Sequence, residues 1–381
     1  MNITWCKKCI LPSTRPRLTI GPDGICSACK AVEENKAINW KGRQDEWRRL
    51  IHIVKSEKKP YDCLLPVSGG KDSTWQAVKV LEYGLRPLAF TWHPPGRTAL
   101  GQKNLDNLIN LGVTHVDFTI NPQIEPKMYL RSLKKFGAMS CMHQAVFNSA
   151  MRFAYQFEIP LVIWSENSAD VYTGGNDPLR GSTMTGEWVK VHGSTHGAKM
   201  TDWMDVSEGL TRQQLQPYDG PGDRLLAQRG IYQVFLGYFF KWDPQQSYEV
   251  ARTHGFEAGQ QPITGYSMHS DIDDPAVAAH HLGKAFKYLF TREFDNLSLE
   301  IRAGRLTRAQ AIGMLCQQGG PNIHMPSIKW LCEYVNIEEE EFWRIMNKWR
   351  NKDLWKREGN RWVAPEFLIP EWDWGVIGAD F

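Results

Sequence analysis

The stretch YDCLLPVSGGKDSTWQAV, residues 61–78, decides the fold of this chain. It begins as a short apolar run and, from SGGKDS at 68–73 onward, continues with the spacing of a helix over 72–83. Glycine lets a backbone approach an oxyanion closely, and the first amides of a helix point at such an anion. The stretch therefore predicts a phosphate-binding loop at the carboxyl end of a buried strand.

Each residue of this loop has an expected part in holding phosphate. The loop consists of Ser68, Gly69, Gly70, Lys71, Asp72 and Ser73. The lysine adds positive charge, the serines add hydroxyl donors, and the aspartate can hold Mg2+ beside the phosphates. The Walker pattern fails because its first glycine would fall on Leu65, and no G-x-G-x-x-G is present. The alternative is a glycine turn that binds no ligand.

Apolar runs and helical patterns alternate along the chain around this loop. The expected strands are 61–67, 86–92, 113–120, 159–165 and 231–240, and the expected helices are 72–83, 99–111, 126–136 and 143–157. This alternation predicts an α/β fold with a parallel sheet covered by helices on both faces. After residue 244 the patterns are nearly all helical. We predict a zinc ribbon at 1–32, an α/β domain at 33–243 and a mainly helical region at 244–381.

The composition is that of an ordinary globular protein. The chain has 381 residues, 42% of them hydrophobic and 23% charged, and its net charge is +3. Such a weak charge creates no strong field toward nucleic acid or anionic lipid. The N-terminus lacks the apolar segment of a secretory signal, and the longest apolar run is about half a membrane span. We expect a cytoplasmic protein that binds neither nucleic acid nor membrane.

Four of the eight cysteines form two pairs near the N-terminus. Cys6 and Cys9 make one C-x-x-C, and Cys26 and Cys29 make the second after a turn rich in glycine and proline. Two such turns complete a tetrahedral site of four thiolates for zinc, at about 2.3 Å per bond. Because sulfur takes every position, we expect the zinc to be structural. Four unligated thiols and a redox C-x-x-C are the alternatives.

The loop SGGKDS resembles the PP-loop of the ATP pyrophosphatases, whose pattern is SGGxDS. Three further segments are similar to the N-acetyl sugar amidotransferases of surface-polysaccharide and O-antigen biosynthesis. They are CKKCILPSTRPRLTIGPDGICSAC at 6–29, GYFFKWDPQQSYEVARTHGFE at 237–257 and SLEIRAGRLTRAQAI at 298–312. The resemblance extends over most of the chain and implies a PP-loop domain joined to a zinc ribbon.

This resemblance implies an enzyme that consumes ATP and forms AMP and diphosphate. ATP would adenylate the acetamido oxygen of a UDP-linked N-acetyl sugar, and ammonia would then replace that oxygen to give an acetamidino sugar. In the family the ammonia comes from a glutaminase subunit similar to that of imidazole glycerol phosphate synthase, with or without its cyclase-like partner. Residues 244–381 lack the strands that a glutaminase needs, so we expect a separate partner. ATP, Mg2+ and structural zinc are the expected cofactors.

Candidate site residues lie at the ends of two further expected strands, which meet the loop if the sheet is parallel. They are Thr91, Trp92 and His93 at the end of one strand, and Glu166, Asn167 and Asp170 after another. The resemblance implies that Thr91 and Trp92 bind the adenosine. His93 is either a proton carrier or an ordinary loop histidine. Glu166 is a candidate catalytic residue, and Asn167 and Asp170, with Arg180 further along, are candidates for binding substrate. A carboxylate here would bind the sugar or guide ammonia, and the alternative is a helix N-cap cluster.

The long segment 166–200 is rich in Gly, Ser, Thr and Asn and carries a set of basic residues. They are Arg180, Lys190, His192, His196 and Lys199. They either bind the diphosphate of a nucleotide-sugar or belong to a solvated loop. We interpret the basic stretch 280–287 as a solvated helical face. Cys141 is expected to be a buried or loop cysteine, and Trp343, Trp349 and Trp355 to fill a helical core or form a docking surface.

Two other functions remain as alternatives. A tRNA thiolase would also combine a zinc ribbon with a PP-loop, but it should carry a pair of sulfur-handling cysteines and a basic face. The lone Cys141 and the weak net charge argue against it. A non-catalytic zinc-ribbon protein that binds nucleic acid or a protein partner would not explain SGGKDS at the end of a strand.

Overall fold

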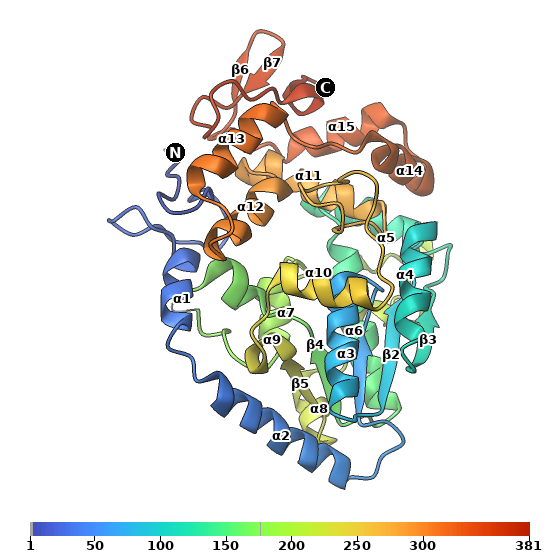
Figure 1. Ribbon diagram of the computed structural model, residues 1–381. Coiled ribbons are helices and arrows are strands. Elements are labelled where there is room, and N and C mark those ends of the chain that lie inside the picture. Colours follow the sequence, from blue (N-terminus) through green and yellow to red (C-terminus); the bar gives the residue numbers. More distant parts are fainter. Residues whose placement is uncertain (1–2, 176) are drawn as a thin grey trace.

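The computed structural model describes residues 3–175 and 177–381. Its centre is a parallel sheet with the strand order β3-β2-β1-β4-β5 (Figure 1). The strands are β1 (Cys63–Pro66), β2 (Pro87–Trp92), β3 (Thr114–Phe118), β4 (Leu161–Trp164) and β5 (Tyr232–Phe235). The predicted α/β fold is confirmed. The three inner strands β2, β1 and β4 are almost entirely buried, as expected for a parallel sheet covered on both faces.

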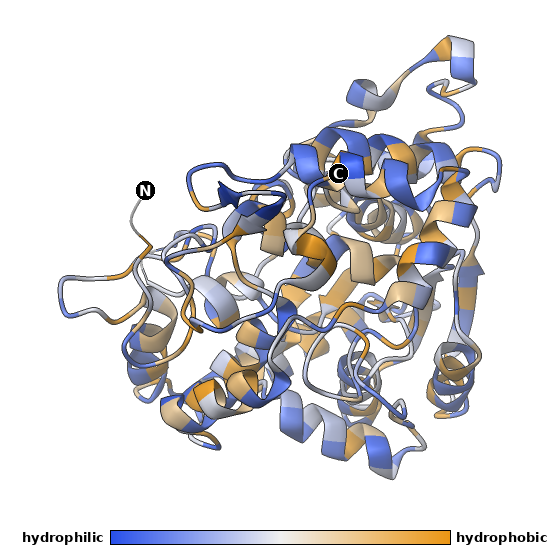
Figure 2. Cartoon of the chain, turned by 90° about the horizontal axis from the view of Figure 1, so that it is seen from above, coloured by the Kyte–Doolittle hydropathy of each residue, from blue (hydrophilic) through white to orange (hydrophobic). Residues whose placement is uncertain are grey.

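Helices cover both faces because successive strand residues point to opposite sides. Leu64 belongs to one apolar core, whereas its neighbours Cys63 and Leu65 belong to the other. The first face carries α2 (Trp40–Ser56), α3 (Lys71–Glu82), α4 (Ala99–Ile109) and α9 (Leu236–Phe239). The second carries α5 (Glu125–Phe136), α6 (Ser140–Gln156), α7 (Gly186–His192) and α8 (Asp223–Gln228). The apolar segments in Figure 2 gather accordingly in the interior of the molecule.

A helical layer lies beyond the carboxyl ends of the strands (Figure 1). It contains α11 (Ala276–Tyr288), α12 (Arg292–Arg302), α13 (Arg308–Gln318), α14 (Met325–Val335) and α15 (Glu339–Lys348). Helix α10 (Pro244–Thr253) packs on α3. Trp343 and Trp355 are buried in the apolar core of this layer, so the core interpretation holds for them, and Trp349 is half-buried. None of the described helices is long and apolar enough to cross a membrane.

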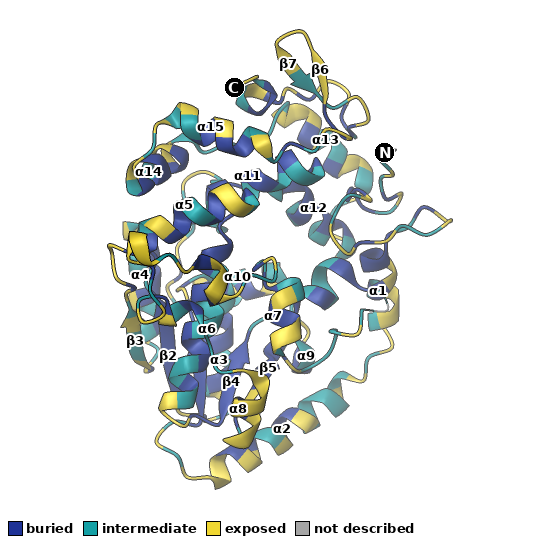
Figure 3. Ribbon diagram, turned by 180° about the vertical axis from the view of Figure 1, so that it is seen from behind, coloured by how far each residue is buried: buried dark blue, intermediate teal, exposed yellow. Residues whose placement is uncertain are grey.

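The N-terminal segment folds beside the helical layer. Its first helix is α1 (Ser27–Asn35), which begins at the second cysteine pair. Arg308 donates from Nε to the carbonyl oxygens of Cys6 and Cys9 at 3.1 and 3.0 Å, and so ties the segment to α13. The buried residues of this segment join the same core as α11 to α15 (Figure 3).

Three segments differ from the sequence expectations. The expected strand 231–240 ends at Phe235, because the chain then turns into α9. The segment 166–200, expected as a loop, contains a π-helical turn (Ala169–Thr173) and α7, and single 3-10 turns follow at Met200–Trp203, Val206–Glu208 and Gln216–Tyr218. The region predicted to be helical ends in a hairpin of β6 (Lys356–Glu358) and β7 (Arg361–Val363), then a 3-10 turn (Gly375–Gly378).

Gly69 allows α4 to lie against the glycine loop. Its φ is +87°, and a Cβ at this position would lie 2.6 Å from the backbone N of Leu105 in α4. Any side chain here would push α4 away from the turn that follows β1. The first glycine of the loop is therefore required by packing as well as by backbone conformation.

We expect Gly69→Ala to lower the free energy of unfolding by more than the ~1–3 kcal/mol that a left-handed backbone alone costs. Gly112→Ala is the matched control, because Gly112 has a φ of +100° and open space around its Cβ position. Urea denaturation measures both variants. Equal losses in the two variants would show that contact with α4 is unimportant.

Candidate active site

The glycine loop forms the turn between β1 and α3. The backbone N–H of Ser68 donates to Ser73 Oγ at 3.1 Å, and that of Gly70 donates to Ser68 Oγ at 3.2 Å. Gly70 is the N-cap of α3, a helix of 12 residues. The amides of its first turn have no partners within the helix, so they are available to an anion at the end of β1.

The loop lies where the order of the strands reverses. The chain passes from β1 to β2 on one side, whereas β4 lies on the other, so a crevice is expected between the ends of β1 and β4. Ser165, directly after β4, donates to the carbonyl of Asp72 at 3.2 Å and to Gln76 Oε1 at 2.7 Å. The end of β4, with Glu166 as the next residue, is thus held against the first turn of α3.

Three ionisable side chains meet in this crevice. Lys71 Nζ lies 2.5 Å from Asp72 Oδ2, and Trp242 Nε1 donates to Asp72 Oδ1 at 3.0 Å. Burial and, after it, the nearby charge of Asp72 raise the pKa of Glu166, Lys71 opposes them, and the net pKa is about 7. A carboxyl group that titrates near neutral pH can both accept and return a proton.

Two hollows meet at Glu166. The smaller has a volume of about 70 Å³ and lies between Lys71 and Asp72 on α3 and the segment 266–270. The larger has a volume of about 530 Å³ and is enclosed by the α/β layer, the helical layer and the N-terminal segment. Glu166, Tyr172 and Arg292 line both hollows. The larger one is therefore a cavity next to the glycine loop, of the size that small-molecule ligands occupy.

The larger cavity is rich in positive charge. Its cationic side chains are Arg15, Arg17, Lys190, Lys284, Lys287 and Arg292, against three carboxylates, Glu166, Asp271 and Asp295. Burial lowers the pKa of His281 to about 4 and that of His280 well below its ordinary value, so both are neutral at pH 7. Neutral imidazoles can still donate to a polar ligand.

The interpretation of the stretch 280–287 as a solvated face is wrong. His280, His281, Lys284 and Lys287 all line the cavity, because α11 turns this side toward the α/β layer and not toward solvent. A helical sequence pattern cannot distinguish a polar stripe that faces water from one that faces an internal polar cavity.

The three residues predicted to bind substrate are instead occupied by contacts within the protein. Asn167 donates to the carbonyls of Leu179 and Gly181 and accepts from the backbone of Ala169 and from Trp188. Arg180 Nε lies 2.6 Å from Asp170 Oδ1, and Arg180 also pairs with Glu34. None of the three lines the cavity. Asn167, Asp170 and Arg180 therefore shape the segment 166–200, and their contact with substrate stays a prediction.

The same segment nevertheless brings other predicted residues to the cavity. Lys190, His192 and His196 line it, whereas Lys199 does not. Arg15, Tyr172, Arg292 and Asp295 were missed by the sequence predictions. The pair of arginines between the two C-x-x-C motifs was a usable signal for Arg15, but α12 offers no pattern that distinguishes Arg292 and Asp295 from surface charges.

The last residues of β2, Thr91 and Trp92, and His93 after them lie on the other side of the loop. Thr91 Oγ1 donates to the carbonyl of Val67 at 2.8 Å, directly before the loop. Trp92 is buried and donates to Glu125 at 3.1 Å, and His93 Nδ1 lies 2.9 Å from Asp117 Oδ2. Their roles with adenosine or protons stay predictions, and His93 lines neither hollow.

The four N-terminal cysteines form a buried cluster. The sulfur atoms of Cys6, Cys9, Cys26 and Cys29 all lie within 4.8 Å of one another. The backbone N–H groups of Lys8, Cys9 and Cys26 point at Cys6 Sγ from 3.3 to 3.4 Å, as they would toward a thiolate. Four converging sulfurs fit a tetrahedral metal such as zinc. Cys141, in contrast, is fully buried, and burial raises the pKa of its thiol, as expected for an inert cysteine.

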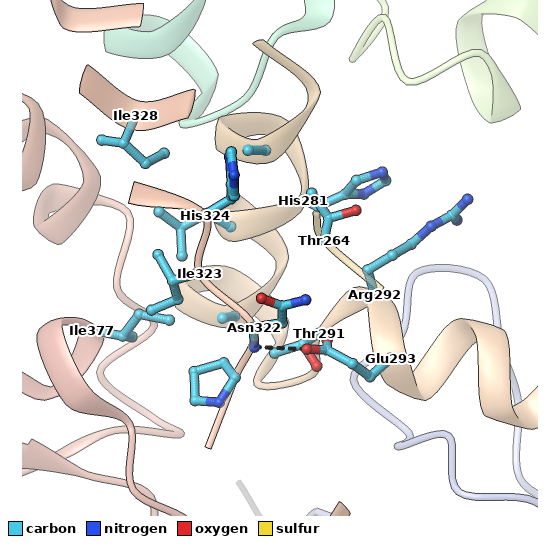
Figure 4. Close-up of a pocket in the computed structure, with 14 residues that line it drawn as sticks. Thr264, His281, Thr291, Arg292, Glu293, Asn322, Ile323, His324, Ile328 and Ile377 are labelled. Carbon is cyan, nitrogen blue, oxygen red and sulfur yellow. Dashed lines mark hydrogen bonds between the residues drawn. The ribbon is translucent and has the colours of Figure 1, made fainter. Parts of the chain in front are cut away.

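A third hollow lies within the helical layer (Figure 4). It has a volume of about 20 Å³, enough for one water molecule at most. The buried carboxylate of Glu293 accepts from the backbone of Asn322 at 2.7 Å there. Arg292 and His281, labelled in the figure, also reach the large cavity, so this hollow is the packing behind one of the cavity walls.

Together these features define an α/β protein with a glycine loop at the end of its central strand, a four-cysteine cluster at its N-terminus and a helical C-terminal layer. Residues 260–368 match the family of the LPS biosynthesis protein WbpG-like, C-terminal domain. This part of the chain is therefore similar to a family of lipopolysaccharide biosynthesis proteins, which agrees with the resemblance found in the sequence motifs. The NMN synthetase of Francisella tularensis aligns with 59% of this chain and 99% of its own, at 14% identity and a TM-score of 0.25. No curated protein matches the chain.

We expect Cys26→Ser to abolish metal binding and to lower the free energy of unfolding, because three sulfurs do not close a structural site that needs four. Cys316→Ser is the control, since Cys316 is exposed and lies outside the cluster. Elemental analysis by mass spectrometry and thermal denaturation are the measurements. If the wild-type protein is as stable without metal as with it, the cluster is not a structural metal site.

Proposed function

We propose that the chain is the synthase subunit of an ATP-dependent amidotransferase acting on a nucleotide-linked N-acetyl sugar in lipopolysaccharide O-antigen biosynthesis. The observation that carries this proposal is the convergence of Lys71, Asp72 and Glu166 between the glycine loop and a cationic cavity of about 530 Å³. The match of residues 260–368 to a lipopolysaccharide biosynthesis family supports the choice of pathway. The loop would hold ATP, and the cavity would receive the sugar nucleotide.

The first step activates an unreactive amide. The acetamido oxygen attacks the α-phosphorus of ATP, the bond to the β-phosphate oxygen breaks, and diphosphate leaves. Lys71 and the first-turn amides of α3 stabilise the negative charge on the α-phosphate. Asp72 is placed to hold Mg2+, which would neutralise charge on the phosphates when bound.

The second step replaces oxygen by nitrogen. Ammonia adds to the activated carbon, the nitrogen loses a proton, and the bond to the AMP oxygen breaks to give the acetamidino group and AMP. Glu166 is the base that accepts this proton, because it lies where the loop and the cavity meet. We propose that a glutaminase subunit, similar to that of imidazole glycerol phosphate synthase, delivers the ammonia. The rival tRNA thiolation would need a reactive sulfur in this region, and Cys141 is buried in the core.

We expect purified protein with ATP, ammonium and UDP-linked N-acetyl sugars to form AMP and to lower the mass of the sugar nucleotide by about one unit, since oxygen is replaced by NH. Lys71→Met should reduce the rate ~10²–10³-fold, the usual cost of removing one charge-stabilising donor. Lys79→Met, on the same helix but paired with Glu82, is the control. Chromatography with mass spectrometry measures both products. AMP formation with tRNA and with no sugar would overturn the proposal.

We expect the rate at a fixed concentration of free NH3 to rise with pH through about 7 and then level off. The pKa of Glu166 is raised to about 7, so the carboxyl is protonated below this pH and accepts a proton only above it. Glu166→Gln should be slow and should lose this dependence. Glu187→Gln, at an exposed position on α7, should behave as the wild type. An unchanged pH profile in Glu166→Gln would exclude Glu166 as the base.

A further inference from the structure

The cavity wall includes part of the N-terminal segment. Arg15, Pro16 and Arg17, between the two cysteine pairs, line the large cavity together with residues of α7 and α11. Thr14 Oγ1 donates to the carbonyl of Tyr288 at 2.5 Å, and Arg15 Nε lies 3.0 Å from Asp295 Oδ1. The loop between the cysteine pairs is thus fastened to the helical layer at the edge of the cavity.

The cations near Arg15 outnumber the carboxylates that pair with them. Asp295 is fully buried and receives both Arg15 and Lys284, the latter at 2.9 Å. Lys287 lies one turn further along α11 and donates to the carbonyl of Phe136. Burial first, and then the neighbouring Lys284, lower the pKa of Lys287 to about 8, as expected for a cation without a counter-charge. A buried cluster of this kind costs stability unless an anion joins it.

Backbone strain points to the same cavity. Among the described residues, eight that are not glycine have a positive φ, and four of these line the cavity: Arg17, Ser194, His196 and Asp271. Strained backbone of this kind costs about 1–3 kcal/mol per residue and gathers at functional sites. Arg17 has a φ of 61°, is exposed and lines the cavity, and no ion pair to it occurs within residues 3–175 and 177–381. A guanidinium without an ionic partner thus lies at the cavity wall.

Orphaned polar atoms also mark the cavity as built for a ligand. Nδ1 of His280, Nδ1 of His281 and Oγ of Ser168 are buried without a hydrogen-bond partner among the described residues, and all three residues line the cavity. Native proteins rarely leave such atoms unpaired. Arginine, lysine and neutral histidine side chains together suit phosphate oxygens, and arginine pairs with two of them at once.

We infer that the loop between the cysteine pairs is a phosphate-recognition element: Arg17, with Arg15 behind it, binds the diphosphate of the sugar nucleotide opposite Lys284 and Lys287. This inference rests on the proposed function for the identity of the ligand. The acetamido end would then lie toward Glu166 and Arg292, where the cavity meets the glycine loop. The four-cysteine site is accordingly a positioning element for substrate as well as a structural one, because it fixes both ends of the loop that carries the two arginines.

The test compares UDP with uridine as probes, measured by calorimetry on the full-length, metal-loaded protein. The wild type should bind UDP at least 10-fold more tightly than uridine. Arg17→Ala should remove most of this affinity gap between UDP and uridine without changing the affinity for ATP. Arg17→Lys should restore part of it, since the charge returns. Arg224→Ala, at an exposed position on α8 outside the cavity, should leave the gap unchanged.

Two further experiments distinguish substrate positioning by the cysteine site from an effect on protein stability and from the proposed reaction. Cys26→Ser, confirmed as folded by circular dichroism at low temperature, should lose the same preference for UDP while still binding ATP. If it does not fold, the Arg17 variants decide. Equal gaps in wild type and Arg17→Ala would overturn the inference. A wild type that forms AMP from the sugar nucleotide but shows no preference for UDP over uridine would overturn it too, and would leave the proposed reaction standing.

Discussion

The contact between Gly69 and α4 is the constraint on which the site depends. A backbone without a side chain lets Leu105 approach the turn after β1, and this fixes the position of α4. At the start of α4, Thr98 donates from its side chain to the carbonyl of Ile272 and from its backbone to that of Asp273. Through these bonds α4 holds the segment 259–275 over the glycine loop, so one glycine connects the sheet to the layer that covers the crevice.

The second constraint is the buried charge between the layers. Arg15, Lys284 and Arg292 converge near Asp295 and Asp271, although each comes from a different part of the chain. Burial raises the pKa of Asp295, but Arg15, Lys284 and Arg292 outweigh it and hold this pKa below its ordinary value. Apolar residues of similar volume would often be as stable as such a network. Its position beside the large cavity agrees with the inference that a negatively charged ligand binds there.

The N-terminal cysteines join these two constraints. The cluster closes a loop whose backbone is tied to α13 through Arg308 and whose arginines reach the cavity. A metal at this position would stabilise the fold and fix one wall of the large cavity at the same time.

The sequence by itself determined the strand–SGGKDS–helix unit, the alternation of strands and helices, and the four clustered cysteines. Each of these patterns is built from short segments, in which glycine conformation, side-chain periodicity and ligand spacing act locally. Only the tertiary structure decided that His280, His281, Lys284 and Lys287 face a cavity, and that Asn167, Asp170 and Arg180 do not. The reason is that the cavity joins side chains from residue 15 to residue 295, and a helical pattern does not reveal what its polar face will meet.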